Sequence, residues 1–475
     1  MGNINRRHFL KTMGSLMAVP SIPSLAPSLS KFTSGEQGDR PNIVFLFSDD
    51  QSVPDLGAYG NQVIHTPNLD RLATQGMRFN RAYVSSPQCS PSRASILTGR
   101  IPHDVHASRL HSDVPEYVPN MVQMLNKAGY FTGAFRKVHQ PTIRDDFQFY
   151  GNDQASFESF FEKRPDDQPF FLHFGSHDPH RGYQKGAFNP PTNPDKIPVP
   201  EYLPDTPVVR QDLANYYDEL ARFDKDCGEL LALLEQHGLV ENTMVVMSGD
   251  NGLPFPRAKG TLYEPGINVP LLIKWPGHIR EGHVSNELVS LMDLTATWLE
   301  MAGVSVPDIM QSKSMLPLFG DENASIRDYI FAERNWHDNW DPMRCIVSKS
   351  HKLIQNYRPE KPYIPSLDLQ NSPSYKEIQR LISEQKLPDR LSWYKQESRP
   401  QVEFYDLDDD PHEWNNLAGQ SQYADLVKQY QLDLGKWMND THDFLPPPRN
   451  AFPGPPDSGL NKRINPLNAQ PYENN

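Results

Sequence analysis

The sequence has few cysteines, no long apolar run and no excess of positive charge, and each shortage excludes a class of protein. Its 475 residues include three cysteines, Cys89, Cys227 and Cys345, which are too few and too far apart for a disulfide framework or a structural zinc site. No run of about 18 apolar residues occurs, so we expect no stable insertion into a membrane. Because 59 acidic residues outnumber 46 basic ones, for a net charge of −13, nucleic acid is not an expected partner.

The composition is that of a globular protein with more than one domain. Hydrophobic residues make up 37% of the chain and charged residues 22%, which are ordinary values for globular proteins. At roughly 100–200 residues per domain, the length predicts two to four domains.

The N-terminus carries a pattern typical of export. Arg6 and Arg7 stand before a weakly apolar stretch from Met13 to Leu29, which resembles a twin-arginine secretion signal that is read by a receptor. The alternative is a tail that contains two arginines by chance. We expect an exported protein, periplasmic or secreted by the twin-arginine route, and we exclude residues 1–40 from the fold.

Apolar runs and helical periodicity alternate along the first two thirds of the chain. Residues 42–48 and 243–248 are continuous apolar runs, which are typical of buried parallel strands, and residues 269–274 are typical of another buried strand. Between the first two of these runs, residues 211–237 place apolar side chains at helical spacing. Strands that alternate with helices indicate an α/β core.

The pattern changes from about Met343, where short strands replace the long apolar runs. Residues 344–347, 352–356 and 402–407 are typical of short strands, and residues 422–437 are typical of a helix that closes a small α+β domain. We therefore expect four parts: an export signal and linker at 1–40, a main domain at 41–340, a small domain at 341–445 and a proline-rich tail at 446–475.

Polar side chains follow two of the expected strands. Asp49 and Asp50 come directly after the first strand, and Asp250 and Asn251 follow another. Ligands bind outside the carboxyl ends of strands in open α/β sheets, so these residues can converge on one cation. Oxygen ligands favour calcium or magnesium and disfavour zinc. Taken alone, such pairs are also common in turns and helix caps.

The segment from Cys89 to Arg100 reads CSPSRASILTGR. It resembles the signature of the type I sulfatases, both in its Cys-x-Pro-x-Arg core and in its Leu-Thr-Gly-Arg ending. The alternative is a buried cysteine near the start of a helix that has only a structural role. The resemblance implies an alkaline-phosphatase-like α/β sandwich with a central mixed sheet, in which residues 41–340 are catalytic. It also implies that the small α+β domain carries an antiparallel sheet.

The resemblance further implies one calcium ion and an altered cysteine. In this family a maturation enzyme oxidises the cysteine to formylglycine, whose hydrate has two hydroxyl groups on one carbon. One hydroxyl attacks sulfur, and the other then expels sulfate as the aldehyde re-forms. The residues that match the calcium ligands of the family are Asp49, Asp50, modified Cys89, Asp250 and Asn251.

Five further positions match catalytic residues of the family. By this match Arg93 and Lys137 would hold the hydrate and stabilise charge. His139 would take a proton during release, and His177 would protonate the leaving group. Lys259 would touch the sulfate group, and Asp250 would also act as the base for the hydrate.

Within the family, several segments are similar to the sulfamidases, the N-sulfoglucosamine sulfohydrolases. Lys259 departs from that pattern, because arginine stands there in the sulfamidases, so N-sulfate and O-sulfate remain alternatives. Bacterial relatives also act on sulfated algal polysaccharides such as ulvan, and we expect a sulfated oligosaccharide as substrate. Candidate sugar-recognition residues are His111, Asp113, Arg181, His337 and Arg344.

Two other functions remain open at this stage. A phosphoesterase or phosphonate hydrolase of the same superfamily often has Thr or Ser as nucleophile and binds two metal ions, but the sequence shows no second set of ligands. A non-catalytic carbohydrate-binding protein on this scaffold would be expected to have lost the cysteine, Arg93 or the metal ligands. All of these residues are present.

Overall fold

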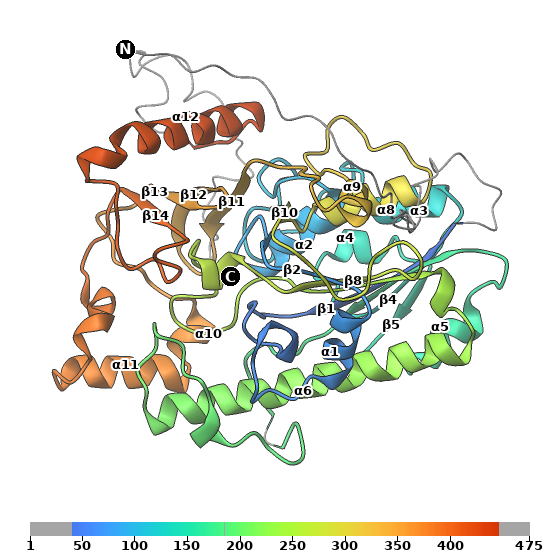
Figure 1. Ribbon diagram of the computed structural model, residues 1–475, viewed down its shortest axis with the longest axis horizontal. Coiled ribbons are helices and arrows are strands. Elements are labelled where there is room, and N and C mark those ends of the chain that lie inside the picture. Colours follow the sequence, from blue (N-terminus) through green and yellow to red (C-terminus); the bar gives the residue numbers. More distant parts are fainter. Residues whose placement is uncertain (1–39, 185, 446–475) are drawn as a thin grey trace, which may run out of the picture.

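The computed structural model describes residues 40–184 and 186–445 (Figure 1). The expected export signal and the proline-rich tail lie outside these described residues. Two sheets organise the chain: an eight-stranded sheet and a four-stranded antiparallel sheet, with a two-stranded ribbon beside them. Figure 1 shows the large sheet between layers of helices and the small sheet to one side, under the long helix near the end of the chain.

The large sheet is mixed. Its strand order is β5-β4-β6-β1-β7-β8-β2-β9, and the neighbours from β5 to β7 pair in parallel, whereas β8 is antiparallel to β7 and to β2. The strands are β1 (Asn42–Ser48), β2 (Met77–Phe79), β4 (Phe131–Arg136), β5 (Phe149–Gly151), β6 (Phe170–Gly175), β7 (Thr243–Gly249), β8 (Leu271–Lys274) and β9 (His283–Ser285). The ribbon consists of β3 (Ala82–Tyr83) and β10 (Val289–Ser290).

The apolar runs at 42–48 and 243–248 are buried parallel strands, as expected, and they lie next to each other in the sheet. β1 and β7 pair in parallel, and every residue of both is buried. Alternate side chains of β1 face opposite layers, as strand geometry requires. Phe45 packs in the cluster that contains Trp298 of α8 (Asp293–Met301), and Leu46 packs in the cluster that contains Phe223 of α6 (Pro207–Gln236).

Helices cover both faces of this sheet. Figure 1 shows α6 running along one side with α1 (Pro67–Thr74), while α2 (Cys89–Thr98), α3 (Met121–Lys127) and α8 lie on the other. The expected helix at 211–237 is the greater part of α6, which starts earlier because Pro207 occupies its first turn. The short helices α4 (Pro141–Arg144), α5 (Glu158–Lys163), α7 (Glu264–Ile267) and α9 (Leu316–Gly320) also precede the small sheet in the chain.

The small sheet has the order β11-β12-β13-β14 and is antiparallel throughout. Its strands are β11 (Ile330–Trp336), β12 (Trp340–Val347), β13 (His351–Asn356) and β14 (Val402–Asp406), and α12 (Ala424–Asp440) packs on it. The expected short strands and closing helix are therefore present. The sheet begins at Ile330, before the boundary expected at residue 341.

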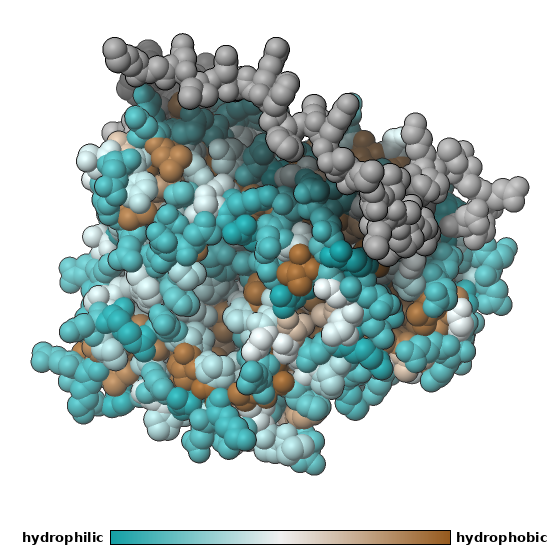
Figure 2. Space-filling model, viewed as in Figure 1, coloured by the Kyte–Doolittle hydropathy of each residue, from teal (hydrophilic) through white to brown (hydrophobic). Residues whose placement is uncertain are grey.

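The connection between β13 and β14 leaves the small sheet and returns to the main domain. It contains α10 (Leu367–Gln370) and α11 (Pro373–Ser383), and Ile378 of α11 packs in one cluster with Leu213 of α6. Short 3₁₀ turns occur at Gly57–Tyr59, Pro194–Lys196, Val240–Asn242, Asp389–Lys395 and Ser421–Tyr423. The face in Figure 2 is mostly hydrophilic, with apolar residues in separate small groups. Among the described residues, no helix combines the length and apolar character needed to cross a bilayer.

Candidate active site

The expected site residues follow four neighbouring parallel strands. In the order β4-β6-β1-β7, the carboxyl ends of these strands meet at one edge of the sheet, which is where open α/β sheets bind ligands. Asp50, just after β1, adopts a left-handed backbone with φ of 69°. Such a conformation in a residue other than glycine is often found at functional sites. The residues at this edge are Asp49 and Asp50 after β1, Lys137 and His139 after β4, His177 after β6, and Asp250 and Asn251 after β7.

The three carboxylates among these residues form a buried cluster with the thiol of Cys89. Asp49, Asp50, Asp250 and Cys89 each offer one ligand atom, and these atoms all lie within 4.8 Å of one another. Asn251 Nδ2 donates to Asp50 Oδ1 at 2.8 Å, which leaves the amide oxygen of Asn251 for another partner.

Two oxygen atoms of this group fit a cation. Within the described residues, Asp49 Oδ1 and Asn251 Oδ1 are buried and accept no hydrogen bond. A buried acceptor without a donor is costly, and a bound cation removes that cost. Because the donors are carboxylate and amide oxygens, they suit a hard ion such as calcium or magnesium.

Each carboxylate of the cluster also has its own cationic partner. Arg93 Nε donates to Asp250 Oδ2 at 2.8 Å, and Lys259 Nζ donates to Asp50 Oδ2 at 2.7 Å. Lys137 Nζ donates to Asp49 Oδ2. Lys259 also contacts Asp368, so four carboxylates and three cations sum to −1, and a divalent cation would make the pocket singly positive. The arrangement can therefore bind an anion once a metal ion is present.

The charges shift the pKa values of the cluster in opposite directions. Burial acts to raise the pKa of Asp49, but Lys137, together with His180 and Arg93, holds it well below its usual value. Burial and the neighbouring Asp49 carboxylate raise the pKa of Asp250 to about 6, against the opposing effect of Arg93. Repulsion between these crowded carboxylates is a further reason to expect a cation among them.

Cys89, a member of this cluster, is the first residue of α2. Its side chain is 2% exposed, and Sγ lies 3.6 Å from Asp50 Oδ1. Burial, with the negative charge of Asp250, raises the pKa of the thiol well above its usual value. Arg93, one turn later on the same helix, points to Asp250.

His139, which follows β4, is in contact with His111. His139 Nε2 and His111 Nδ1 are 3.1 Å apart, and both residues have positive φ angles, of 65° and 63°. Burial and the charges of Lys137 and Arg93 hold the pKa of His139 far below its usual value. The imidazole is therefore neutral at neutral pH.

His177 and His180 sit at different depths. The His177 side chain is 56% exposed, and its Nε2 lies 3.4 Å from Asp153 Oδ1 at the rim. His180 Nε2 lies 3.9 Å from Asp50 Oδ2, so it is close to the acidic cluster. The sequence analysis assigned no role to His180, which lies three residues after His177.

Asp368 of α10 is a second residue that sequence reasoning missed. Asp50, His180 and Asp368 form another group whose potential ligand atoms lie within 4.8 Å of one another, although the sequence showed no second set of metal ligands. The ammonium of Lys259 contacts both of these carboxylates, at 2.7 Å and 3.1 Å, and so supplies positive charge there. No local pattern marks Asp368, which is 109 residues from Lys259 in the chain.

The candidate sugar-recognition residues differ in what they contact. Arg181 is largely buried, and its three donor nitrogens bind Asp212 and the Pro254 carbonyl. Arg344 is fully buried and pairs with Asp443. We therefore leave these two arginines out of the proposed substrate contacts.

The other three candidates lie around the loops of the site. Asp113 accepts hydrogen bonds from the backbone and hydroxyl of Thr142, at 3.0 and 2.6 Å. His337 Nδ1 lies 2.8 Å from Asp338 Oδ2, just after β11. His111 contacts His139 directly, so it is the candidate nearest to the catalytic positions.

Comparison with known proteins decides the family. Residues 41–304, more than half of the chain, match the family model described as Sulfatase. The chain belongs to the sulfatase family. Residues 257–392 of this sulfatase also match the model described as N-sulphoglucosamine sulphohydrolase, C-terminal, so the expected similarity to sulfamidases is confirmed. The chain is therefore an enzyme, a sulfuric ester or sulfamate hydrolase.

Individual relatives extend over nearly all of this sulfatase. It is 32% identical to human N-sulphoglucosamine sulphohydrolase, over 92% of this chain and 96% of the relative. It is 28% identical to an ulvan-active sulfatase of Formosa agariphila, over 93% of this chain and 80% of the relative.

Solved structures confirm the expected alkaline-phosphatase-like sandwich. A protein solved with its substrate D-glucosamine-2-N,6-O-disulfate superposes with a TM-score of 0.66 at 21% identity, covering 85% of this chain and 98% of that one.

Proposed function

We propose that this sulfatase removes sulfate groups from sulfated oligosaccharides, with one calcium ion and a formylglycine made from Cys89 by a maturation enzyme. The observation that carries the proposal is the buried cluster of three carboxylates around Cys89, matched by three cations. The carbohydrate substrate is supported by the names of the two relatives, which act on N-sulfoglucosamine and on ulvan.

The calcium ion would be held by the oxygen atoms of the cluster, including those that lack a donor. Once bound, it would supply a Lewis acid that polarises a sulfate oxygen. The ligands would be Asp49, Asp50, Asp250, Asn251 and the modified side chain of residue 89.

Cys89 itself is a poor nucleophile in this setting. A thiol attacks as its thiolate, and burial among carboxylates disfavours that form. A hydrated aldehyde needs no thiolate, because one of its hydroxyl groups can give up a proton to Asp250 during attack. The proposed attack by a hydrate therefore does not depend on ionisation of Cys89.

The remaining residues have separate tasks in this proposal. Arg93 and Lys137 orient the hydrate through their contacts with Asp250 and Asp49. Neutral His139 takes a proton from the second hydroxyl when sulfate leaves. The other two tasks are those of His177, which protonates the leaving group from the exposed rim, and Lys259, which contacts the sulfate.

The first experiment replaces the nucleophile. Cys89→Ala is expected to abolish sulfate release while the protein stays folded, because only one buried sulfur is lost. Cys227→Ala is the matched control, since it removes another buried sulfur from α6, away from the site. Substrates would be heparan-derived N-sulfoglucosamine, ulvan fragments and other algal oligosaccharides. Wild-type rates for Cys89→Ala, or only unmodified thiol in the mass spectrum of active protein from the native host, would contradict the mechanism.

Export is proposed on the N-terminal sequence alone. Because Arg6 and Arg7 resemble a twin-arginine signal, replacing both with lysine is expected to keep the protein in the cytoplasm. Cell fractionation of the native host measures this, and normal delivery of the double variant to the periplasm would rule out the route.

A further inference from the structure

Lys259 is held between two carboxylates, and only one of them is exposed to solvent. Lys259 Nζ lies 2.7 Å from Asp50 Oδ2 and 3.1 Å from Asp368 Oδ2. The side chains of Asp50 and Lys259 are 0% and 2% exposed, whereas that of Asp368 is 23% exposed. Asp368 is therefore the member of this trio that a bound sugar can touch.

Short local contacts fix the Asp368 carboxylate. The Ser366 hydroxyl and the Leu369 amide both donate to Asp368 Oδ1, the amide at 2.9 Å. One residue earlier, the Leu367 amide donates to Asp338 Oδ2 at 2.7 Å, which ties α10 to the end of the small sheet. A carboxylate held in this way can bind a partner without first being ordered.

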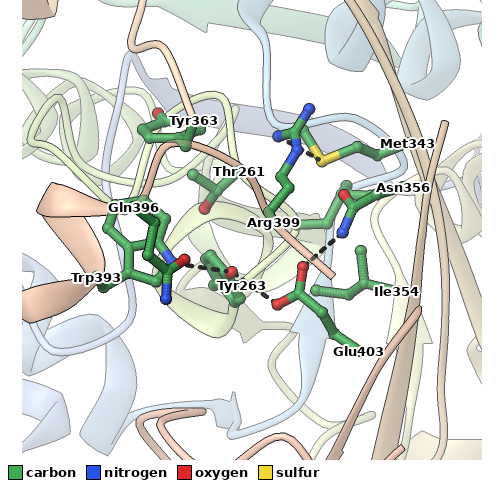
Figure 3. A pocket seen from close by; sticks show the side chains of 11 residues that line it. Thr261, Tyr263, Met343, Ile354, Asn356, Tyr363, Trp393, Gln396, Arg399 and Glu403 are labelled. Carbon is green, nitrogen blue, oxygen red and sulfur yellow. Dashed lines mark hydrogen bonds between the residues drawn. The ribbon is translucent and has the colours of Figure 1, made fainter. Parts of the chain in front are cut away.

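The same connection also holds the backbone around Lys259. The Tyr363 hydroxyl donates to the Lys259 carbonyl at 3.1 Å. In Figure 3, Tyr363 and Trp393 from the connection line a small cavity with Thr261 and Tyr263, which follow Lys259 in the chain. Trp393 Nε1 donates to the Tyr263 hydroxyl at 3.3 Å, so the separation of Asp368 from Lys259 is set by packing of both segments.

The bonding capacity of Asp368 is not exhausted. A carboxylate accepts about four hydrogen bonds. Ser366, Leu369 and Lys259 account for three of them, which leaves room for one donor on the exposed side. Although burial acts to raise it, Lys259 holds the pKa of Asp368 below its usual value, so the group is anionic at neutral pH.

We propose that Asp368 selects the substrate, by accepting a hydrogen bond from a sugar hydroxyl or amine and by repelling a second sulfate group close to the reacting one. This inference rests on the proposed function, because it assumes that sulfate binds beside Lys259. A donor on the sugar meets the free acceptor of Asp368, whereas another sulfate would bring a negative charge against a partly buried carboxylate.

The test compares sugars that differ by one sulfate group. The singly sulfated sugars are glucosamine 2-N-sulfate and glucosamine 6-O-sulfate, and each is compared with glucosamine 2-N,6-O-disulfate. The ratio of kcat/KM for the singly and doubly sulfated sugars is measured for each pair that wild type turns over. Asp368→Asn is expected to move that ratio about tenfold toward the doubly sulfated sugar, mainly through its KM.

Three other variants separate specificity from structure. Asp368→Glu keeps the charge and is expected to keep the wild-type ratio, and Asp368→Ser is a second way to remove the charge if the Asn variant folds poorly. Glu360→Gln is the matched control, because it removes an exposed carboxylate from the same connection and is expected to change neither rate nor ratio.

The possible failures can be told apart. If the Asn and Ser variants lower kcat/KM equally for both sugars of a pair, Asp368 only positions Lys259 and this inference is overturned. If wild type releases sulfate from none of the pairs and from none of the polysaccharide fragments, the proposed function fails and this inference fails with it.

Discussion

Gly252 follows the two polar residues at the end of β7, and its lack of a side chain is a packing requirement. A Cβ atom on Gly252 would lie 1.8 Å from the carbonyl oxygen of Pro265, which is backbone and cannot rotate away. The Gly252 amide also donates to the Gly266 carbonyl at 3.0 Å. The glycine thus lets the chain after Asp250 and Asn251 lie directly against the segment that contains α7.

Gly252→Ala is therefore expected to disturb the proposed calcium ligands and destabilise the protein by about 3 kcal/mol, the upper part of the range for overpacked sites. Sulfate release should fall at least tenfold, and thermal unfolding should shift to lower temperature. Gly419→Ala is the control, since nothing lies within 4 Å of its added Cβ. Equal melting temperatures and rates for both variants would show that the Pro265 backbone moves freely, contrary to this account.

At the scale of the element, the start of α6 has the residues that are typical of a helix N-terminus. Thr206 has extended backbone angles and its side chain accepts a hydrogen bond from the Val209 amide at 3.3 Å, while Pro207 takes the first helical position. The helix then packs against α1 and α11, so its start helps to place the connection that carries Asp368.

Thr206→Ala removes this cap and is expected to lower stability by about 1 kcal/mol, while activity stays near that of wild type. Thr206→Ser keeps the hydroxyl and should behave like wild type. Urea unfolding followed by circular dichroism measures both. A midpoint for the Ala variant that matches the Ser variant would mean that the side chain contributes nothing to the start of α6.

Some elements could be predicted from their residues and others could not, for physical reasons. β1 and β7 are recognisable because strands buried on both faces are apolar throughout. β8 is apolar too, but an apolar run carries no information on direction, and its antiparallel pairing with β7 appears only in the fold. β11 breaks the pattern, because it buries Glu333 and Arg334 against partners far away in the chain.

The candidate site shows the same division. The sequence placed Asp49, Asp250 and their neighbours at strand ends, and the resemblance supplied roles for Cys89 and Arg93. Asp368 could not be found in this way, because its role depends on a short helix that returns from the small sheet to Lys259.

For the whole molecule, the net charge of −13 does not describe the pocket, where three basic side chains lie among four carboxylates. Burying three carboxylates with three cations is favourable only while every charge keeps its partner. A calcium ion bound to the folded protein would add to its stability by mass action, by about 2.7 kcal/mol when the free ion is at 100 times its dissociation constant.

Removal of calcium with EGTA is therefore expected to abolish sulfate release and lower the melting temperature, and added calcium should restore both. Asp250→Asn, which removes one proposed ligand charge, should show a much smaller shift in melting temperature with calcium. Differential scanning calorimetry measures the shift independently of activity. An unchanged melting temperature of metal-free wild type across calcium concentrations would contradict the assignment of this cluster as the calcium site.

Because Cys89 is buried, an enzyme can modify it only before the chain has folded. Cys89 begins α2 and is 2% exposed. If it is the residue that is oxidised, a maturation enzyme cannot reach it once the sheet and helices have packed. Modification then competes with folding, and a chain that folds first keeps its thiol permanently. The specific activity of a preparation would then measure the fraction of molecules that were modified before they folded. Two batches of equally well folded protein could therefore differ in specific activity.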